Sequence, residues 1–441
     1  MRLHGAVIGG LVAGLMCSTA AVAQDGSGYS AGFTVGGIGF LMPDYEAPGV
    51  ITDGVGGVEA THQVMLFGGV LAGSWATPLS DDGRTLLGKS GFMAIGVGNS
   101  TMNVTLDGQG TLFLPGYTTP TGTIEVNASY TGGGTVTSDA VISGTGGDGS
   151  SDLDNAGSGA QDGWGANQSG SAFTLFGGGT FNDPADIDDL AFAFGAIAST
   201  EGGVFLATGD LTGVEITSSL DSTVVYGGID LSIARAGEGN IQGYVGPSYR
   251  YLKQDYTSDI MINMLETDVP PDTTFADYTQ STNEVMTSHY LGGAAGISYV
   301  AASEDGNTFS FGGEVGVYNR MTDFEGMQSY TLSGGVPALV EGDQTVTNST
   351  TLTDSDSGIA YALRGQAVWT KPTAENRQIS FGLGGEYLSS VPTLTRSYLG
   401  SNFGGTTDDA DYTGPETSDT PMLSFGEMFN VSGTVSWTGQ F

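Results

Sequence analysis

Residues 431–441 read VSGTVSWTGQF, and their side chains alternate in character along the chain. One parity carries apolar residues and glycine, with Val431, Val435, Trp437 and the terminal Phe441 on it. The other parity carries uncharged polar residues: Ser432, Thr434, Ser436, Thr438 and Gln440. Because successive side chains of a strand point to opposite faces, this stretch predicts a strand with one apolar face and one polar face.

An alternating strand that ends the chain on Phe resembles the C-terminal strand of Gram-negative outer-membrane β-barrels. The resemblance implies an all-β fold, a single closed antiparallel transmembrane barrel, and a location in the bacterial outer membrane. It also implies contact with outer-membrane lipid and lipopolysaccharide, and recognition of the C-terminal strand by the barrel assembly machinery.

The composition is compatible with such a barrel. The chain has 441 residues, with 75 Gly, 18 Tyr and 20 Phe, and only 13% of its residues are charged. Beyond the first residues, no window approaches the about 18 consecutive apolar residues that a membrane-spanning helix needs. The 11 basic and 48 acidic side chains leave a formal charge of −37, which argues against a nucleic-acid partner.

The N-terminus reads as a secretory signal peptide over residues 1–23. Arg2 begins it, residues 6–16 form its apolar core, and the small residues 21–23 form a cleavage site. Residues 24–441 are then the mature barrel. Since Cys17 is the single cysteine and lies in the leader, we expect neither disulfides nor thiolate chemistry.

Alternating segments joined by short turns and long loops predict the strands. The second half contains such segments at 224–235, 241–253, 289–302, 308–321, 359–370, 379–390 and 425–441. Those in the first half are 30–41, 61–77, 90–99, 171–181, 190–206 and 221 onward. The total is about twelve strands, within a range of ten to fourteen. Residues 101–170 form a large surface insertion, partly of low complexity.

The apolar faces of these strands are expected to meet lipid. Trp75, Trp369, Trp437 and Phe441 lie near the ends expected at the periplasmic rim, as an aromatic girdle would. The alternative is that the same side chains form one side of a soluble β-sandwich or β-helix core.

The opposite faces carry the charged residues of the strands. Counting from the turns places Glu314, Arg364 and Glu386 at similar heights on neighbouring strands, so we expect them to cluster inside the barrel. Arg250 and Asp230 form a possible second pair. These five residues line a pore that selects solutes by charge, or else they brace a narrow interior. The inward glycines favour a water-filled passage: Gly292, Gly296, Gly312, Gly316, Gly382 and Gly384.

The acidic excess is concentrated in predicted loops, at 148–162, 255–284, 323–356 and 408–419. Such loops attract divalent cations, which could bridge to lipopolysaccharide. The closest calcium pattern, residues 152–157, lacks a glutamate at the twelfth position, which is Gly163. A metal site therefore stays unknown.

Catalysis has little support in the sequence. After processing, the histidines are His62 and His289, and the residue two positions after His289 is Leu291 rather than the serine of outer-membrane phospholipases. We expect no catalytic residues and no cofactor.

The sequence therefore favours a passive porin-like channel for small hydrophilic or cationic solutes. The alternatives are a closed, non-conducting structural or adhesive barrel, an autotransporter with residues 24–170 as passenger, and a soluble secreted β-protein. The transported solute and the oligomeric state stay open.

Overall fold

The computed structural model describes the following residues: 29–47, 51–53, 61–79, 85–106, 109–114, 123–132, 134–143, 163–169, 172–181, 190–199, 202–210, 214–236, 240–263, 266–267, 273–274, 277–333, 346–374, 376–396 and 421–441. For 107–213 this description covers the backbone only. The predicted signal peptide, the calcium pattern at 152–157 and the acidic stretch 408–419 lie outside the described residues. No helix in the described part of the chain is long and apolar enough to cross a membrane.

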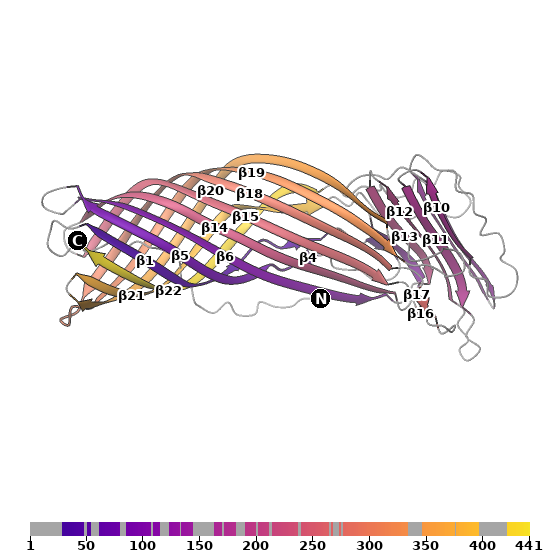
Figure 1. The fold of residues 1–441 in the computed structure, drawn as a ribbon, viewed down its shortest axis with the longest axis horizontal. Coiled ribbons are helices and arrows are strands. Elements are labelled where there is room, and N and C mark those ends of the chain that lie inside the picture. The colour runs from indigo at the N-terminus through magenta and orange to yellow at the C-terminus, as the bar shows by residue number, and fades with distance from the viewer. Residues whose placement is uncertain are drawn as a thin grey trace.

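Ten antiparallel strands form a closed barrel, shown in Figure 1. They are β1 (Ser30–Leu41), β5 (Met65–Pro78), β6 (Thr85–Thr105), β14 (Glu215–Ala236), β15 (Ile241–Asn263), β18 (Asp277–Ala302), β19 (Thr308–Ser333), β20 (Val346–Ala374), β21 (Arg377–Arg396) and β22 (Pro421–Gln440). Each strand pairs with its neighbour in sequence order around the barrel. The first strand closes the ring because β1 pairs with β5 on one side and with β22 on the other.

The strand count is ten, at the lower end of the predicted range of ten to fourteen. The segments 171–181 and 190–206 were expected in the barrel, but they form β11 (Ala172–Phe181), β12 (Leu190–Ser199) and β13 (Gly202–Asp210) of a separate sheet. That sheet has six strands in the order β10-β11-β12-β13-β7-β3, with β10 (Gly163–Ser169), β7 (Gln109–Leu114) and β3 (Ile51–Asp53). Strands β8 (Thr123–Gly132) and β9 (Gly134–Ser143) pair with each other, as do β16 (Glu266–Thr267) and β17 (Thr273–Thr274).

The C-terminal strand occupies the predicted place at one rim of the barrel. Ser30 pairs with Gln440, and Tyr29 and Phe441 exchange two backbone hydrogen bonds of 3.0 and 2.8 Å. We call this end of the barrel the terminal rim and the opposite end the distal end. The short connections lie at the terminal rim. In one of them, Gly306 adopts a φ of 77°, and Ser303 N–H donates to the Asn307 carbonyl at 2.8 Å.

The strands run further toward the distal end than the sequence suggested. Much of the predicted acidic loops at 255–284 and 323–356 is strand, because β15, β18, β19 and β20 continue through them. The outward Thr side chains of these stretches suit a strand, including one whose outer face meets water rather than lipid. Asp255, Asp259, Asp323 and Glu325 therefore project from barrel strands and not from loops.

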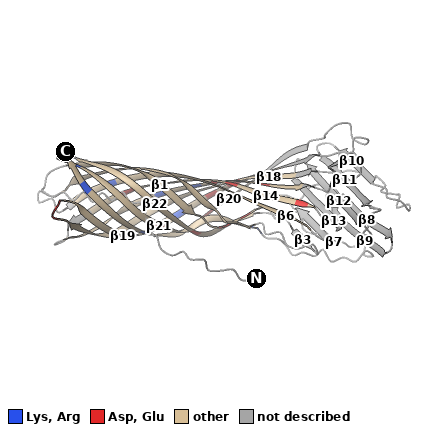
Figure 2. Cartoon of the chain, turned by 90° about the horizontal axis from the view of Figure 1, so that it is seen from below, with Lys and Arg blue, Asp and Glu red and all other residues tan. Residues whose placement is uncertain are grey.

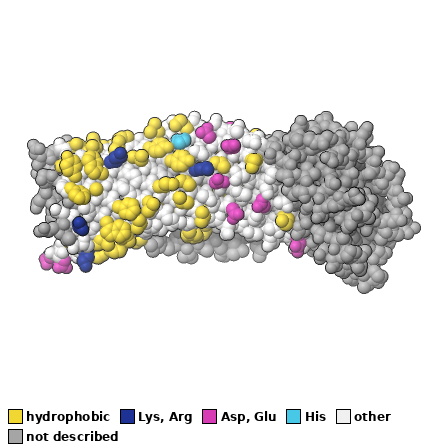
Figure 3. All heavy atoms as spheres, viewed as in Figure 1, with side chains coloured by type: hydrophobic (Ala, Val, Ile, Leu, Met, Phe, Trp, Pro, Cys, Tyr) yellow, Lys and Arg dark blue, Asp and Glu magenta, His cyan; other side chains and the backbone are white. Residues whose placement is uncertain are grey.

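The outer surface of the barrel carries an apolar belt near the terminal rim. Leu291, Val245 and Phe309 are 59%, 60% and 40% exposed, and the belt is visible as yellow side chains in Figure 3. Charged residues are sparse along the strands in this part of the wall (Figure 2). The soluble sandwich is therefore wrong, since Phe309 and Trp437 would be buried against a second layer.

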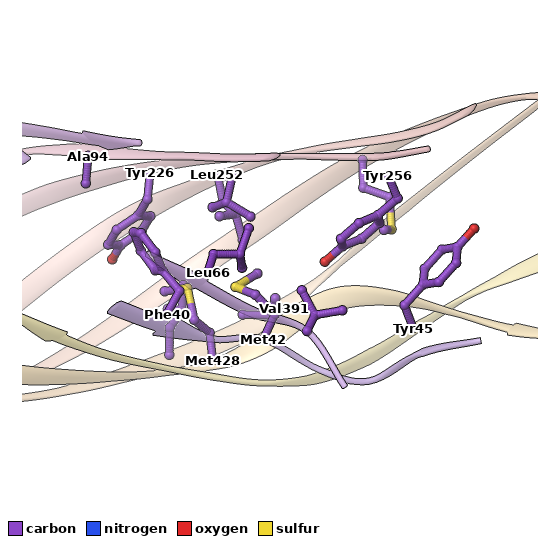
Figure 4. Close-up of a cluster of buried hydrophobic side chains, with 14 of the residues drawn as sticks. Phe40, Met42, Tyr45, Leu66, Ala94, Tyr226, Leu252, Tyr256, Val391 and Met428 are labelled. Atoms are coloured by element: carbon purple, nitrogen blue, oxygen red, sulfur yellow. The ribbon is translucent and has the colours of Figure 1, made fainter. Parts of the chain in front are cut away.

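The interior of the barrel holds the core. Fully buried apolar side chains from most of the strands meet across the lumen, including Tyr226, Leu252, Met286, Leu388 and Met428. Figure 4 shows Phe40 and Tyr226 facing each other, and their rings meet edge to face at 6.4 Å between centroids.

Candidate functional site

The lumen contains a network of five charged side chains near the terminal rim. Glu314, Arg364 and Glu386 are direct partners in the registers of β19, β20 and β21. Arg364 Nη1 lies 2.7 Å from Glu314 Oε1, and Arg364 Nε lies 2.7 Å from Glu386 Oε1. The structure thus brings together the three residues that the turn positions placed at one height.

Arg250 and Asp230 belong to the same network rather than to a separate pair. Arg250 Nη1 lies 2.8 Å from Asp230 Oδ1, and Asp230 Oδ2 lies 3.4 Å from Arg364 Nη1. The side chains of Arg250 and Glu386 are 0% exposed. Burial favours ionic groups that pair with one another, and these ion pairs join five strands across the lumen.

Aromatic side chains surround the network. The Tyr226 hydroxyl donates to Glu386 Oε1 at 2.7 Å, and the Arg250 guanidinium lies 5.3 Å from the Phe92 ring centroid. Tyr318 hydrogen bonds to Ser248 at 2.9 Å, and its ring lies 6.0 Å from the same guanidinium. Aromatic rings therefore pack against the charged layer on several sides.

The inward glycines do not leave open space, contrary to the expectation from sequence. A methyl group at Gly312 would meet Gln366 Nε2 at 3.0 Å, and one at Gly382 would meet Thr434 Oγ1 at 2.6 Å. At Gly296 it would collide with the Tyr244 ring, and at Gly316 with the Tyr318 ring. Each of these glycines makes room for a larger side chain, so their small size is a result of dense packing.

A second polar cluster lies in the lumen toward the distal end. It involves the short strands β2 (Tyr45–Glu46) and β4 (Thr61–His62), which pair with each other and connect β1 to β5. Beside them, Met42 N–H donates to the Val64 carbonyl at 3.0 Å. Tyr45, Met42 and Val64 are almost fully buried, so this inner hairpin, residues 42–47 and 61–64, packs into the barrel.

An arginine and a glutamate of the wall hold the inner hairpin. The Tyr45 hydroxyl donates to Glu284 Oε2 at 2.7 Å, and Arg396 Nη2 donates to Glu284 Oε1 at 2.5 Å. Arg396 also donates from its backbone N–H to Glu46 Oε2 and from Nε to the Glu46 carbonyl, both at 3.0 Å. Burial and the Glu284 carboxyl raise the pKa of Tyr45 well above its ordinary value, so the phenol stays protonated.

Sequence reasoning missed this cluster. Glu284 was placed in a loop, although it shares its parity with the inward residues Ser288 and Tyr290 of the same strand. Extending the alternation of β18 beyond the membrane belt would have identified it. Nothing in the local sequence marks Tyr45 as a residue of the lumen.

The predicted interface residues lie on the outer surface near the terminal rim. Trp75 and Trp369 are 39% exposed, Trp437 is 48% exposed and Phe441 is 82% exposed. Trp369 stacks on Phe381 with 5.6 Å between ring centroids. Their contact with a lipid interface stays a prediction.

The two histidines of the described residues lie in different environments, His62 buried inside the barrel and His289 on its outer surface. His62 lies in the inner hairpin. Its Nε2 lies 2.9 Å from Ser218 Oγ of β14, and its Nδ1 lies 3.1 Å from Ser100 Oγ of β6. His289 points outward and hydrogen bonds to the Tyr249 hydroxyl at 2.8 Å. Among the described residues, no group of three or more His, Cys, Asp or Glu side chains could hold a metal ion.

No protein-family model matches the sequence, and no curated protein does. Similar solved structures include the outer membrane protease OmpT from Escherichia coli, with 10% identity, 94% of this chain and 97% of that chain covered, and a TM-score of 0.34. A Pseudomonas aeruginosa FadL homologue has 9% identity, coverage of 94% and 90%, and a TM-score of 0.23. The Ralstonia pickettii toluene transporter TbuX has 9% identity, coverage of 96% and 92%, and a TM-score of 0.18.

These neighbours are Gram-negative outer-membrane β-barrels. On superposition, this chain departs widely from all three structures. Its closed antiparallel barrel, apolar outer belt and polar or packed lumen have the architecture of outer-membrane β-barrels, as the C-terminal strand indicated.

Proposed function

We propose that this protein is a bacterial outer-membrane barrel with a closed, non-conducting lumen, which anchors an extramembrane β-sheet at the cell surface. The observation that carries the proposal is the filled lumen. Arg250 and Glu386 are buried in the charged network, Tyr226 and Tyr318 pack against them, and the inner hairpin packs toward the distal end.

The ionic network acts as an internal brace in this proposal. Glu314, Arg364 and Glu386 link three neighbouring strands, and Arg250 with Asp230 extends the link to the opposite part of the wall. Removing one member of such a buried network would leave an uncompensated charge, so each member holds the others in place.

The anchoring role follows from where the second sheet enters the chain. Its strands β7 and β10 to β13 lie between β6 and β14, whose consecutive ends Thr105 and Glu215 are paired at the distal end. With the terminal rim in the periplasm, as in outer-membrane barrels, this insertion is carried on the cell surface. Lipopolysaccharide, the barrel assembly machinery and divalent cations belong to the same proposal as partners.

A porin-like channel is the second candidate, and one observation favours it. The lumenal network contains three carboxyl groups and two guanidinium groups, a composition that would prefer cations in a hydrated state. Conduction would require both the network and the inner hairpin to move out of the lumen.

Planar bilayer recording separates the two candidates. Purified full-length protein should insert without producing ion-conducting steps, while a known porin in the same bilayer conducts. Reconstitution is verified by protease protection of the inserted barrel. Regular conductance steps from the unmodified protein would reject the closed barrel and favour the channel.

The anchoring role has a separate test. Deleting residues 109–210 and joining β6 to β14 with a short glycine linker should leave a barrel that inserts and stays silent in the bilayer. The same deletion should abolish any binding of whole cells to surfaces or matrix. Unchanged cell binding would contradict the anchoring role.

A further inference from the structure

Within the described part of the chain, the distal half of β20 has one ladder partner, β19. Its register with β21 ends at Ala362 and Leu388, whereas its register with β19 continues as far as Leu332 and Val346. Beyond Leu388, β21 continues in register with β22. Among the described residues, β20 therefore has no ladder partner on its β21 side from 346 to 361. We call this side the free edge.

Two serines end the ladder between β20 and β21. The register of β21 shifts between Ser389 and Val391, where Ser390 adopts a φ of 56°. The Tyr361 N–H donates to Ser389 Oγ at 2.8 Å, and Ser390 Oγ donates to the Ile359 carbonyl at 2.9 Å. The bulge thus replaces the next two ladder bonds with side-chain bonds.

These bonds show which backbone groups face the free edge. Tyr361 and Ile359 have odd numbers, and backbone groups alternate in direction along a strand, so those of Ser357, Ser355 and Thr353 face the same way. Consistent with this, the Ser355 N–H donates at 2.7 Å to the carboxylate of its exposed neighbour Asp354. The Asp354 side chain thus takes the hydrogen bond that a ladder partner would accept from the Ser355 N–H.

A groove with acidic lining lies beside the free edge. It has a volume of about 520 Å³ and crosses β18, β19 and β20, with Thr287, Asp323, Glu325 and Ser355 among its lining residues. Figure 3 shows Asp and Glu side chains on the barrel surface beyond the apolar belt. A strand added to β20 would be separated from Asp323 and Glu325 of β19 by β20 alone. A lysine or arginine side chain of the added strand could reach across β20 to these carboxylates.

We propose that the free edge of β20 binds an extended, basic segment of a partner polypeptide by strand addition. The partner's backbone pairs with Ser357, Ser355 and Thr353, and replaces the Asp354 carboxylate at the Ser355 N–H. Its outward lysine or arginine side chains enter the groove next to Asp323 and Glu325. Main-chain bonds supply affinity in this mode, and side chains supply specificity.

A second copy of the chain does not fit this edge. Two copies in one membrane keep the same orientation across it, so two β20 strands run in the same sense. Antiparallel pairing of the two free edges would require one barrel to be inverted. The charge around the edge also disfavours a second copy, because Asp323, Glu325 and Asp354 would face their own counterparts.

The test uses full-length protein in detergent micelles and a synthetic fluorescent peptide in which lysine alternates with valine and threonine. One matched peptide carries glutamate in place of lysine. Another carries N-methyl groups on alternate residues, which removes backbone donors and keeps the side chains. Fluorescence anisotropy should detect binding of the first peptide and at least about tenfold weaker binding of the other two.

Protein variants locate the binding. Ser355→Pro removes a backbone donor that faces the free edge and leaves the ladder to β19 intact. It should therefore lower the affinity for the lysine peptide at least about tenfold. Asp323→Asn combined with Glu325→Gln should also lower the affinity for the lysine peptide. The ratio of affinities between the parent and N-methylated peptides should stay the same in this variant. Thr223→Ala, on the outer face of β14, is the matched control and should bind normally.

Equal affinity for the parent and N-methylated peptides would overturn strand addition. Equal affinity for the lysine and glutamate peptides would overturn the basic partner. If light scattering shows a dimer that Ser355→Pro dissociates, the occupant is a second copy and the proposal is wrong. Because the readout is peptide binding, these outcomes do not depend on whether the barrel conducts ions.

Discussion

Arg250 fills the space that a side chain at Gly228 would need: a methyl group at residue 228 would lie 2.7 Å from both Cδ and Nη1 of Arg250. The Gly228→Ala substitution should therefore push the guanidinium away from Asp230 and from the Phe92 ring. Overpacking of this kind costs about 1–3 kcal/mol. Urea unfolding of the protein in micelles, followed by tryptophan fluorescence, should show a lower midpoint.

Gly365 provides the matched control for this substitution. A methyl group at Gly365 would meet no atom within 4 Å, on a strand that also carries Arg364. Gly365→Ala should leave the unfolding midpoint unchanged or raise it slightly, because alanine reduces the freedom of the unfolded chain. An equal loss in both variants would mean that strand flexibility, and not the contact with Arg250, explains the effect.

Arg364→Met should destabilise the barrel more than any single glutamine substitution in the network. It leaves the Glu314 and Glu386 carboxyl groups without their 2.7 Å partner in a buried site, which costs about 3–5 kcal/mol. Adding Glu314→Gln and Glu386→Gln to Arg364→Met removes the uncompensated charge and should restore much of the loss. No recovery in the urea midpoint of the triple variant would contradict the ionic brace.

Several features of the barrel could be predicted because they repeat a simple period. The parity of residues 431–441 gave the apolar and polar faces of β22, and counting from short turns brought Glu314, Arg364 and Glu386 to one height. Both inferences use only local alternation and the geometry of antiparallel pairing. In the structure the three residues are direct partners.

Other features could not be predicted because they depend on distant contacts. The segments 172–181 and 190–199 have the apolar content of barrel strands but pair with each other, a choice that local alternation does not decide. The inward glycines suggested an open passage, yet their neighbours are large side chains such as Tyr244 and Tyr318. Tyr45 and Arg396 meet through Glu284 although they lie far apart in the sequence.

Arg396→Ala should release the inner hairpin. The substitution removes the guanidinium bonds to Glu284 and to the Glu46 carbonyl and leaves a buried carboxylate without its cation. Hydrogen exchange followed by mass spectrometry should show faster exchange at 42–47 and 61–64, with little change near the terminal rim. Arg377→Ala, at that exposed rim, is the control. Unchanged exchange in the hairpin of Arg396→Ala would show that apolar packing alone holds it.

Docking of the inner hairpin should weaken as the pH falls below about 6.5, the ordinary pKa of histidine. Burial lowers the pKa of His62, which belongs to the inner hairpin and packs between Ser218 of β14 and Ser100 of β6. As pH falls through 6.5, an undocked histidine takes up a proton, whereas the docked one, with its lowered pKa, takes one up only at a lower pH, so protons favour the undocked form. The docked form is favoured above this pH.

Amide exchange in the hairpin, measured from pH 7.5 to 5 and corrected for the intrinsic rate, should therefore increase toward acid. His62→Asn keeps a hydrogen-bonding side chain without a titrating group and should flatten this dependence. Because Glu284 and Glu46 also contact the hairpin, the difference between wild type and His62→Asn isolates the histidine. An identical pH dependence in the two proteins would assign the effect to the carboxyl groups instead.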